Sequence, residues 1–238
     1  MPFNFNLMQS YTLDYNHFYN ELKDKPILSD RYVQDLYLNR WFQELKYLDI
    51  FLVSELNSKE AVLKAIDKIK EEPESFQFPI EFNCGTIYIH FRISYMNHLC
   101  KGIKGVLEPI ESFVGPKQFI YWSPIDKNVA NYSNVSNPII VVPYINDKYS
   151  ELVIDGNHRL TYAVNYKKSF ISTVFLSADN ICRSLGFSSA FDTNFYIFYN
   201  EIALYSRLTE MGYKTEELLE KSYLSGYNPH LDELISLL

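Results

Sequence analysis

Residues Leu152–Thr161 have the sequence LVIDGNHRLT, and this stretch decides the fold expected for the middle of the chain. The apolar, mostly β-branched residues before Asp155 are typical of a buried strand. Gly156 permits a tight turn, and Asn157 is a residue type that caps helices. The sequence therefore predicts a strand that ends at Asp155 and a helix that begins near His158.

This bend gathers groups that favour anions. The first turn of a helix carries unpaired backbone N–H groups and about half a positive charge. His158 adds a titratable imidazole to that turn, and Arg159 adds a fixed cation. We therefore expect an anion site with phosphate as its natural ligand. In the alternative interpretation, Asn157 caps the helix and Arg159 bridges to a carboxylate.

The sequence around the bend predicts a compact α+β unit. Strands are expected at residues 119–122, 139–142, 151–154 and 170–176, and a helix at 158–167. Asn146 and Asp147 supply a turn between the second and third strands. The order of strand, turn, strand, loop, helix and strand is typical of a small α+β fold.

Helical segments are expected on either side of this unit. Apolar periodicity predicts helices at residues 30–53, 94–101, 194–211, 215–224 and 230–238, with a hairpin at 78–91. A further helix is expected after Asn57, where Asn57-Ser58-Lys59-Glu60 resembles a capping box and one face carries Val62, Leu63, Ile66 and Ile69. The predicted segments are 1–105 (helical with a hairpin), 106–178 (the α+β core) and 179–238 (helical), in one compact body.

Composition limits the class of protein. The 238 residues are 47% hydrophobic and 21% charged, which is ordinary for a globular protein. The net charge of −7 repels polyanions, so nucleic acid is disfavoured as a partner. The 20 tyrosines and 17 phenylalanines favour an aromatic core, and base-stacking platforms are the alternative.

The cysteines and the apolar runs indicate a compartment. Cys84, Cys100 and Cys182 are widely spaced and odd in number, which fits a reducing cytoplasm better than a disulfide framework. The sequence has no secretory signal pattern at its start and no apolar run as long as a membrane span. We expect a soluble, cytoplasmic protein that does not act at a membrane.

One family resemblance emerges from residues 137–163. The run Asn137-Pro138-Ile139-Ile140-Val141, a hairpin, and then the residues from Val153 to Ala163 resemble the ParB/sulfiredoxin superfamily. The sequence Asp-Gly-x-His-Arg is most similar to the branch that contains ParB-like small-molecule kinases acting on free serine. The resemblance covers about a quarter of the chain. It implies a small mixed sheet with helices.

The resemblance also implies roles at the bend. Gly156 would allow the backbone to approach phosphate, and His158 and Arg159 would contact phosphoryl oxygens. Asn157 and Thr161 would complete the nucleotide site. Asp155 would orient the loop or hold Mg²⁺, and with His158 it is the candidate catalytic group.

The resemblance leaves the general base open and excludes one reaction. Glu108, Glu111 and Asp126 are candidate bases, and none occupies a recognisable family position. Sulfiredoxins carry a cysteine where this chain has Asn157. An amide cannot replace a thiolate nucleophile, so reduction of sulfinic acid is not expected.

These inferences lead to one expected function and two alternatives. The first is a protein that binds the phosphates of ATP, ADP or CTP, with Mg²⁺, and acts as a phosphotransferase or nucleotide hydrolase on a small molecule. The second is a nucleotide-gated DNA-binding protein with a helix-turn-helix within residues 177–224. The third is an interaction protein that keeps the fold without catalysis.

Overall fold

The structure is a computed structural model with two compact units. It describes residues 3–4, 6–7, 9–55, 58, 60–61, 63–64, 67, 74–126, 128–133, 137–226 and 231–238. One unit, here called the helical unit, comprises Met1–Ser94 and Phe187–Leu238. The other, the sheet unit, comprises Tyr95–Gly186. Each is described by itself.

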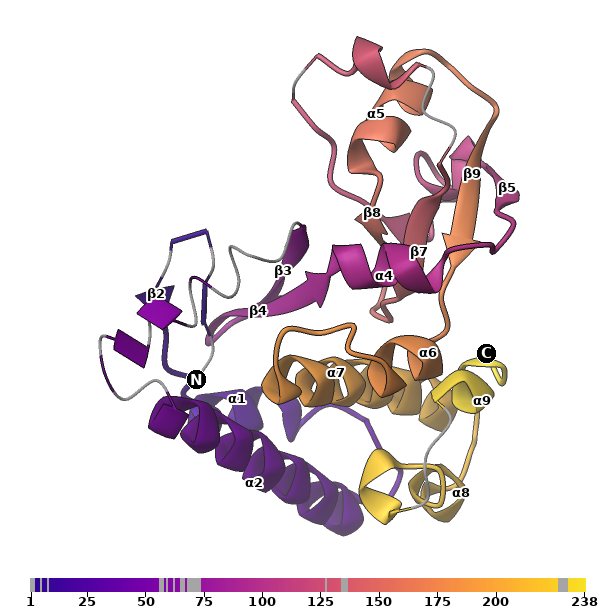
Figure 1. Ribbon diagram of the computed structural model, residues 1–238. Coiled ribbons are helices and arrows are strands. Elements are labelled where there is room, and N and C mark those ends of the chain that lie inside the picture. Colours follow the sequence, from indigo (N-terminus) through magenta and orange to yellow (C-terminus); the bar gives the residue numbers. More distant parts are fainter. Residues whose placement is uncertain are drawn as a thin grey trace. The chain divides into compact units, whose positions relative to one another are not determined.

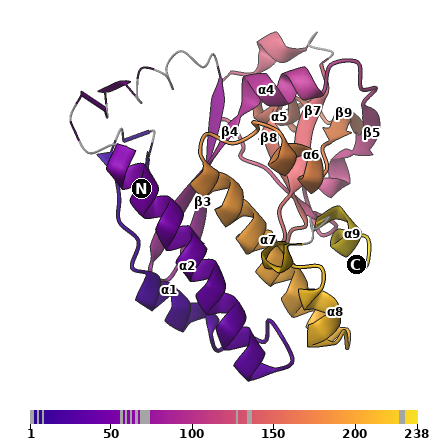
Figure 2. The same ribbon diagram turned by 60° about the horizontal axis from the view of Figure 1, so that its bottom comes forward.

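The helical unit is built from helices and a long hairpin (Figures 1 and 2). Its elements are β1 (Phe3–Asn4), β2 (Gln9–Ser10), α1 (Tyr15–Leu22), α2 (Arg31–Glu55), β3 (Ser75–Phe82), β4 (Gly85–Arg92), α7 (Ala190–Glu210), α8 (Thr215–Leu219), η3 (Tyr223–Ser225) and α9 (Leu231–Ile235). Helix α2 packs against α1 and α7, and β4 packs against α7.

Aromatic packing holds the helical unit together. The ring of Phe18 from α1 contacts Phe42 of α2 at 5.1 Å and Phe198 of α7 at 6.0 Å between centroids. Trp41 of α2 is fully buried and lies 5.5 Å from Phe198. Edge-to-face rings at these distances add stabilisation beyond their buried area. The richness in Phe and Tyr is thus explained in this unit by core packing.

The predicted helices and hairpin agree with the structure where it describes them. Helix α2 coincides with the helix expected at 30–53, and β3 and β4 pair antiparallel with Asn83 and Cys84 as the two-residue loop. Gly85 follows the loop with φ +136°. Most of the helix expected after Asn57 lies outside the described residues, including Asn57 itself, Lys59, Val62, Ile66 and Ile69.

The C-terminal helices differ from the expected bounds at their ends. Helix α7 begins at Ala190 rather than at 194, because the Ser189 hydroxyl accepts a hydrogen bond from the Asp192 N–H and caps the helix there. Helix α8 ends at Leu219 rather than at 224, and the 3₁₀ turn η3 follows it.

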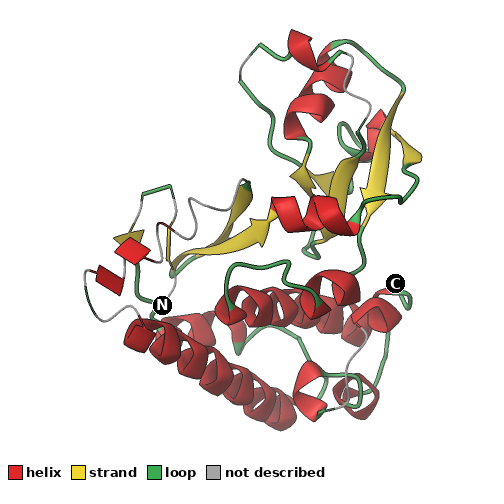
Figure 3. Ribbon diagram, in the orientation of Figure 1, coloured by secondary structure: helices red, strands yellow, loops and turns green. Residues whose placement is uncertain are grey.

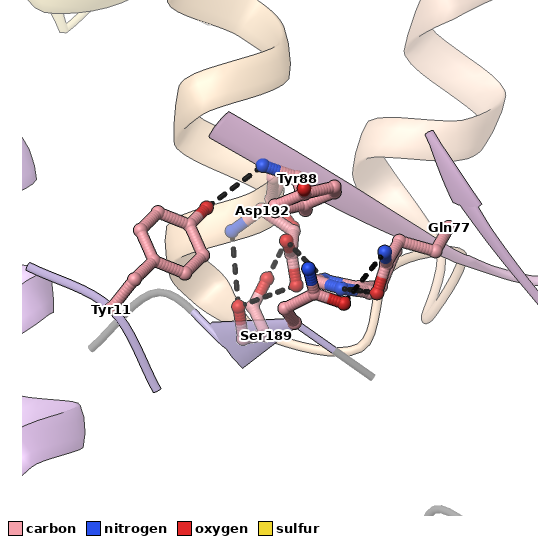
Figure 4. A network of polar contacts seen from close by, with 8 residues as sticks. Tyr11, Gln77, Tyr88, Ser189 and Asp192 are labelled. Carbon is pink, nitrogen blue, oxygen red and sulfur yellow. Dashed lines mark hydrogen bonds and ion pairs between the residues drawn. The ribbon is translucent and has the colours of Figure 1, made fainter. Parts of the chain in front are cut away.

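A buried polar network joins the hairpin to the start of α7 (Figure 4). His90 of β4 is 2% exposed, and its Nδ1 lies 3.0 Å from Asp192 Oδ1. The Ser189 hydroxyl donates to Asp192 Oδ2 at 2.7 Å. His90 Nε2 lies 3.2 Å from the Gln77 side-chain oxygen on β3. The Asp192 carboxylate therefore joins β4 to the first turn of α7.

The sheet unit contains a five-stranded mixed sheet (Figure 3). Its elements are β5 (Val106–Pro109), η1 (Ile110–Ser112), β6 (Ile120–Tyr121), η2 (Ala130–Tyr132), β7 (Ile139–Pro143), β8 (Glu151–Asp155), α5 (Asn157–Asn165), β9 (Phe170–Phe175) and α6 (Ala178–Arg183). Helix α4 (Ile93–Leu99) spans the boundary between the units.

The strand order in this sheet is β5-β9-β7-β8-β6. The pairs β5–β9 and β7–β8 are antiparallel, whereas β7–β9 and β6–β8 are parallel. Between β8 and β9 the chain forms α5, which contacts β7 and β9. Leu160 and Ala163 of α5 share one core cluster with Phe113, Val141 and Val153. The bend at residues 155–157 therefore joins the sheet to the helix that covers it.

The α+β class and the strands expected at 139–142, 151–154 and 170–176 are confirmed. Strand β5 was not predicted, because its sequence Val-Leu-Glu-Pro has no alternation and it lies at the sheet edge with Val106 and Leu107 exposed. Among the described residues, no helix has the length and apolarity needed to cross a bilayer.

The two units divide the chain differently from the three expected segments. The expected segments 1–105 and 179–238 contribute to a single unit, because α2 and α7 pack against each other. The sheet unit extends beyond the expected core of 106–178 and includes most of α4 and all of α6.

Replacing Asp192 with alanine tests the buried network. Asp192→Ala leaves the buried His90 imidazole and the Ser189 hydroxyl without their acceptor, so we expect a loss of about 2–4 kcal/mol in the free energy of unfolding. Glu111→Ala is the control: its ion pair with Lys117 is 3.5 Å long between side chains that are 74% and 81% exposed. That change should alter stability by less than about 1 kcal/mol. Urea denaturation measures both, and equal losses would contradict the prediction.

Candidate functional site

The candidate site is the bend between β8 and α5, where Gly156 has a backbone conformation that few other residues adopt. Its φ is +94° and its ψ is 17°, and it is the N-cap of α5. A Cβ atom here would lie 2.4 Å from Ile139 Cγ2 and 2.8 Å from Arg159 Nη2. Ile139 is fully buried and has no room to move aside. Glycine is required by the dihedral angle and by the close approach to β7.

The bend leaves backbone donors at the start of α5. The first hydrogen bond of the helix runs from the Leu160 N–H to the Gly156 carbonyl at 2.9 Å. The N–H groups of Asn157, His158 and Arg159 therefore have no acceptor within the helix. Gly156 has no side chain that can cap them. The first turn of α5 thus presents donors and the positive end of its dipole.

His158 is held in place by an aromatic partner. Its imidazole stacks on the Tyr132 ring of η2, with centroids 5.0 Å apart and planes at 21°. His158 is half-buried as a residue, and the stacking fixes the orientation of its ring. Tyr132 gives no signal in the sequence, because it lies in a short 3₁₀ helix 26 residues before His158.

Arg159 is engaged by the protein itself. Its Nη2 donates to Asp155 Oδ2 at 2.9 Å and to the Pro138 carbonyl at 3.2 Å. The two charged side chains are 14% and 16% exposed. The guanidinium therefore ties the start of β7 to the end of β8, as in the alternative in which Arg159 bridges to a carboxylate. It is not the outward-facing cation expected from the sequence.

The Asp155 carboxylate therefore already has a charged partner, the Arg159 guanidinium. In the part of the chain that the structure describes, no three His, Cys, Asp or Glu side chains are grouped in a way that could hold a metal ion. A carboxylate that already neutralises an arginine is a poorer Mg²⁺ ligand than a free one. Asp155 thus orients the loop through Arg159, and its role as an Mg²⁺ ligand stays a prediction.

Asn157 and Thr161 position a loop instead of facing a ligand. The Asn157 side-chain oxygen accepts from the Ser123 N–H at 3.0 Å, and the Thr161 hydroxyl oxygen accepts from the Ile125 N–H at 3.1 Å. The same hydroxyl donates to the Asn157 carbonyl at 2.8 Å. Both residues are buried, and buried polar atoms are stable only when paired. The two side chains thus hold residues 123–125 against α5, and their role in nucleotide binding stays a prediction.

The three candidate bases lie in different settings. Glu108 accepts a hydrogen bond from the Ser112 hydroxyl, and Glu111 forms the exposed pair with Lys117. Asp126 is exposed and follows Ile125, which α5 holds through Thr161. Of the three, Asp126 is the one on the loop tied to the bend.

Cys100 lies close enough to Asp155 to be affected by its charge. Burial, and then the Asp155 carboxylate, raise the pKa of the Cys100 thiol to about 11. The thiol therefore stays protonated at neutral pH, so Cys100 does not supply a ready nucleophile at the bend.

Sequence reasoning missed one acid at the opposite end of β8. Burial and, to a smaller extent, the neighbouring Glu108 carboxylate raise the pKa of Glu151 to about 7. Its Oε2 is buried without a hydrogen-bond partner in the described structure. Strand alternation places Glu151 on the same face as the core residue Val153. This alternation is the sequence feature from which the burial of Glu151 could have been predicted.

Compared with known proteins, the chain matches no family model, no curated protein and no solved structure. The resemblance to the ParB/sulfiredoxin superfamily therefore depends on the motif residues and on their place in the sheet unit.

A Gly156→Ala substitution tests the bend. Alanine must adopt a positive φ and its Cβ would clash with Ile139, so we expect a loss of roughly 2–4 kcal/mol of stability. Gly115→Ala is the matched control in the same unit, since Gly115 has φ +85° and nothing within 4 Å of the added Cβ. It should cost only about 1–2 kcal/mol, for the dihedral alone. Thermal unfolding compares the two, and equal losses would show that the close approach is unimportant.

A Glu151→Gln substitution tests the buried acid. The folded-state pKa of Glu151 is about 7, above its ordinary value of 4.5, so its stabilising contribution is complete below about pH 4.5 and is lost as the pH rises through about 7. Glutamine does not ionise. The gain in unfolding free energy of the variant over wild type should therefore be about 2–3 kcal/mol larger at pH 8 than at pH 5. Glu111→Gln, a change at an exposed residue, should show no such pH dependence. A gain for Glu151→Gln that is equal at pH 5 and pH 8 would contradict the prediction.

Proposed function

We propose that the sheet unit binds the phosphate groups of a nucleotide at the bend between β8 and α5. One observation carries the proposal: the uncapped N–H groups that begin α5 lie in the same turn as the half-buried imidazole of His158. Backbone donors and the helix dipole bind phosphate without a dedicated lysine. Gly156 allows the left-handed backbone conformation from which α5 starts with these N–H groups uncapped.

His158 and the helix supply most of the attraction. Asp155 neutralises much of the charge on Arg159, so that guanidinium contributes chiefly by fixing the loop. The His158 ring, held by Tyr132, can donate a hydrogen bond to a phosphoryl oxygen.

The order of elements supports the same proposal. A strand pair ends in the Asp-Gly-Asn-His-Arg loop, and the following helix begins at that loop. This is the arrangement that the resemblance to the ParB/sulfiredoxin superfamily implies for nucleotide phosphates. The net charge of −7 favours a small molecule over a nucleic acid as the second ligand. A phosphotransferase or nucleotide hydrolase would place that molecule near Asp126, the candidate base on the loop tied to α5.

Thermal unfolding with a nucleotide panel tests the proposal. With Mg²⁺ present, at least one of ATP, ADP and CTP should raise the Tm by several degrees when its concentration is about 100-fold above its Kd. His158→Ala should reduce that increase by more than half, because it removes a donor to the phosphate and leaves the backbone donors in place. His98→Ala, which changes an exposed histidine of the same unit, should keep the full increase. The proposal is overturned if no nucleotide shifts the Tm of the wild type, or if His158→Ala responds like His98→Ala.

A further inference from the structure

A second feature, in the helical unit and independent of the proposed function, is a cavity beside the tip of the β3–β4 hairpin. Its volume is about 310 Å³, which is enough for a small organic molecule. Residues 84–88 of the hairpin form one wall, and described residues of the segment 4–18, up to the first turn of α1, form the others. Two parts of the unit that are distant in the sequence therefore enclose it.

Three aromatic rings line this cavity. Tyr11 and Tyr88 have ring centroids 5.6 Å apart and ring planes at 76°. Their relative position is fixed, because the Tyr11 hydroxyl oxygen accepts a hydrogen bond from the Tyr88 N–H at 2.8 Å (Figure 4). The buried ring of Phe18 is the third. The faces of aromatic rings carry negative potential, and rings set at an angle form the cages in which proteins hold quaternary ammonium ions.

The charge at the cavity is negative. Asp14 is the one charged residue among the described residues that line it, and none of these residues is a lysine, an arginine or a histidine. Asp14 Oδ1 accepts hydrogen bonds from the Asn16 and His17 N–H groups, so the positive end of α1 is already capped. Asp14 Oδ2 has no hydrogen-bond partner in the described part of the chain. Charge complementarity therefore favours a cation as the ligand.

A second carboxylate acts on the same wall. Burial, then the Glu21 carboxylate and, to a smaller extent, the Asp14 carboxylate raise the pKa of the Cys84 thiol, which lines the cavity. Glu21 Oε2 is buried without a hydrogen-bond partner in the described structure. A cation in the cavity would supply a counter-charge to both acids, and such a charge stabilises a buried carboxylate.

The polar groups of the wall narrow the class of cation. Asn4 Oδ1 already accepts from the Asn6 and Leu7 N–H groups and from the Gln77 side-chain amide. The Tyr11 hydroxyl oxygen is likewise engaged by a backbone N–H. A primary ammonium ion needs acceptors for three N–H groups, whereas a quaternary ammonium ion has no N–H group to satisfy. Aromatic rings and one carboxylate therefore suit the quaternary ion better.

We propose that this cavity binds a small molecule with a quaternary ammonium group. The rings of Tyr11 and Tyr88 contact the cation, and the Asp14 carboxylate is its counter-charge. The helical unit thereby has a ligand of its own, opposite in charge to the phosphate proposed for the sheet unit.

Calorimetric titration of the full-length protein with choline tests the proposal. The matched control ligand is dimethylbutanol, the neutral alcohol in which a carbon atom replaces the charged nitrogen of choline. Choline should bind about tenfold more tightly than this alcohol, because only the cation is attracted by the rings and the carboxylate. At saturation, choline should shift the backbone ¹⁵N–¹H signals of residues 84–88. Absence of choline binding, equal affinities for the two ligands, or shifts confined to other residues would overturn the proposal.

Two matched substitutions test the role of the carboxylate. Asp14→Asn removes the charge and keeps a residue type that caps helices, so choline affinity should fall about threefold. Asp30→Asn makes the same change before α2, where Asp30 Oδ1 accepts from the Val33 N–H, and should leave choline affinity unchanged. Equal effects of the two substitutions contradict the proposal.

A third substitution tests the aromatic wall. Tyr88→Leu keeps an apolar side chain and removes the ring, so choline affinity should fall about tenfold while the affinity for dimethylbutanol changes less. Retention of full choline affinity by this variant would show that the ring is not part of the site. If Tyr88→Leu does not fold, the two ligands and the two aspartate variants still decide the question.

Discussion

The close approach of Gly156 to Ile139 is the constraint on which the sheet unit depends. It brings the end of β8 against β7 so tightly that no side chain fits between them, and the chain leaves in the left-handed conformation that starts α5. The Arg159 guanidinium then joins the two strands, because it donates hydrogen bonds to Asp155 at the end of β8 and to the Pro138 carbonyl just before β7. Asn157 and Thr161, both on α5, hold the loop after β6 by accepting hydrogen bonds from its backbone N–H groups. The first-turn N–H groups of α5 are left without an acceptor within the helix.

Much of this arrangement could be predicted from local sequence. The β-branched runs at 139–142 and 151–154 and the Asp-Gly bend gave the strands, the turn and the helix, because burial and backbone preference agree there. The long aromatic helices α2 and α7 of the other unit were also predicted from their apolar periodicity, whereas the short helix α1 was not. Strand β5 was missed because an exposed edge strand of four residues carries no burial pattern.

The site was harder to predict than the fold. The sequence shows that Arg159 follows Gly156 by three positions. Whether the Arg159 side chain faces solvent depends on Asp155 at the end of β8, four residues earlier, and on the more distant Pro138. The same holds for Tyr132 under His158. Partners supplied by separate elements leave no spacing in the sequence. A buried acid such as Glu151 therefore looks like an ordinary charged residue until the fold buries it.

The central claim is that the first-turn amides of α5 hold phosphate. Backbone ¹⁵N–¹H spectra of the whole protein, titrated with nucleotide and Mg²⁺, test it at the atoms concerned. The account predicts large shifts of the Asn157, His158 and Arg159 amide signals with increasing nucleotide, because a phosphoryl oxygen would accept their hydrogen bonds. Saturation by a nucleotide that moves other signals and leaves these three in place would contradict it.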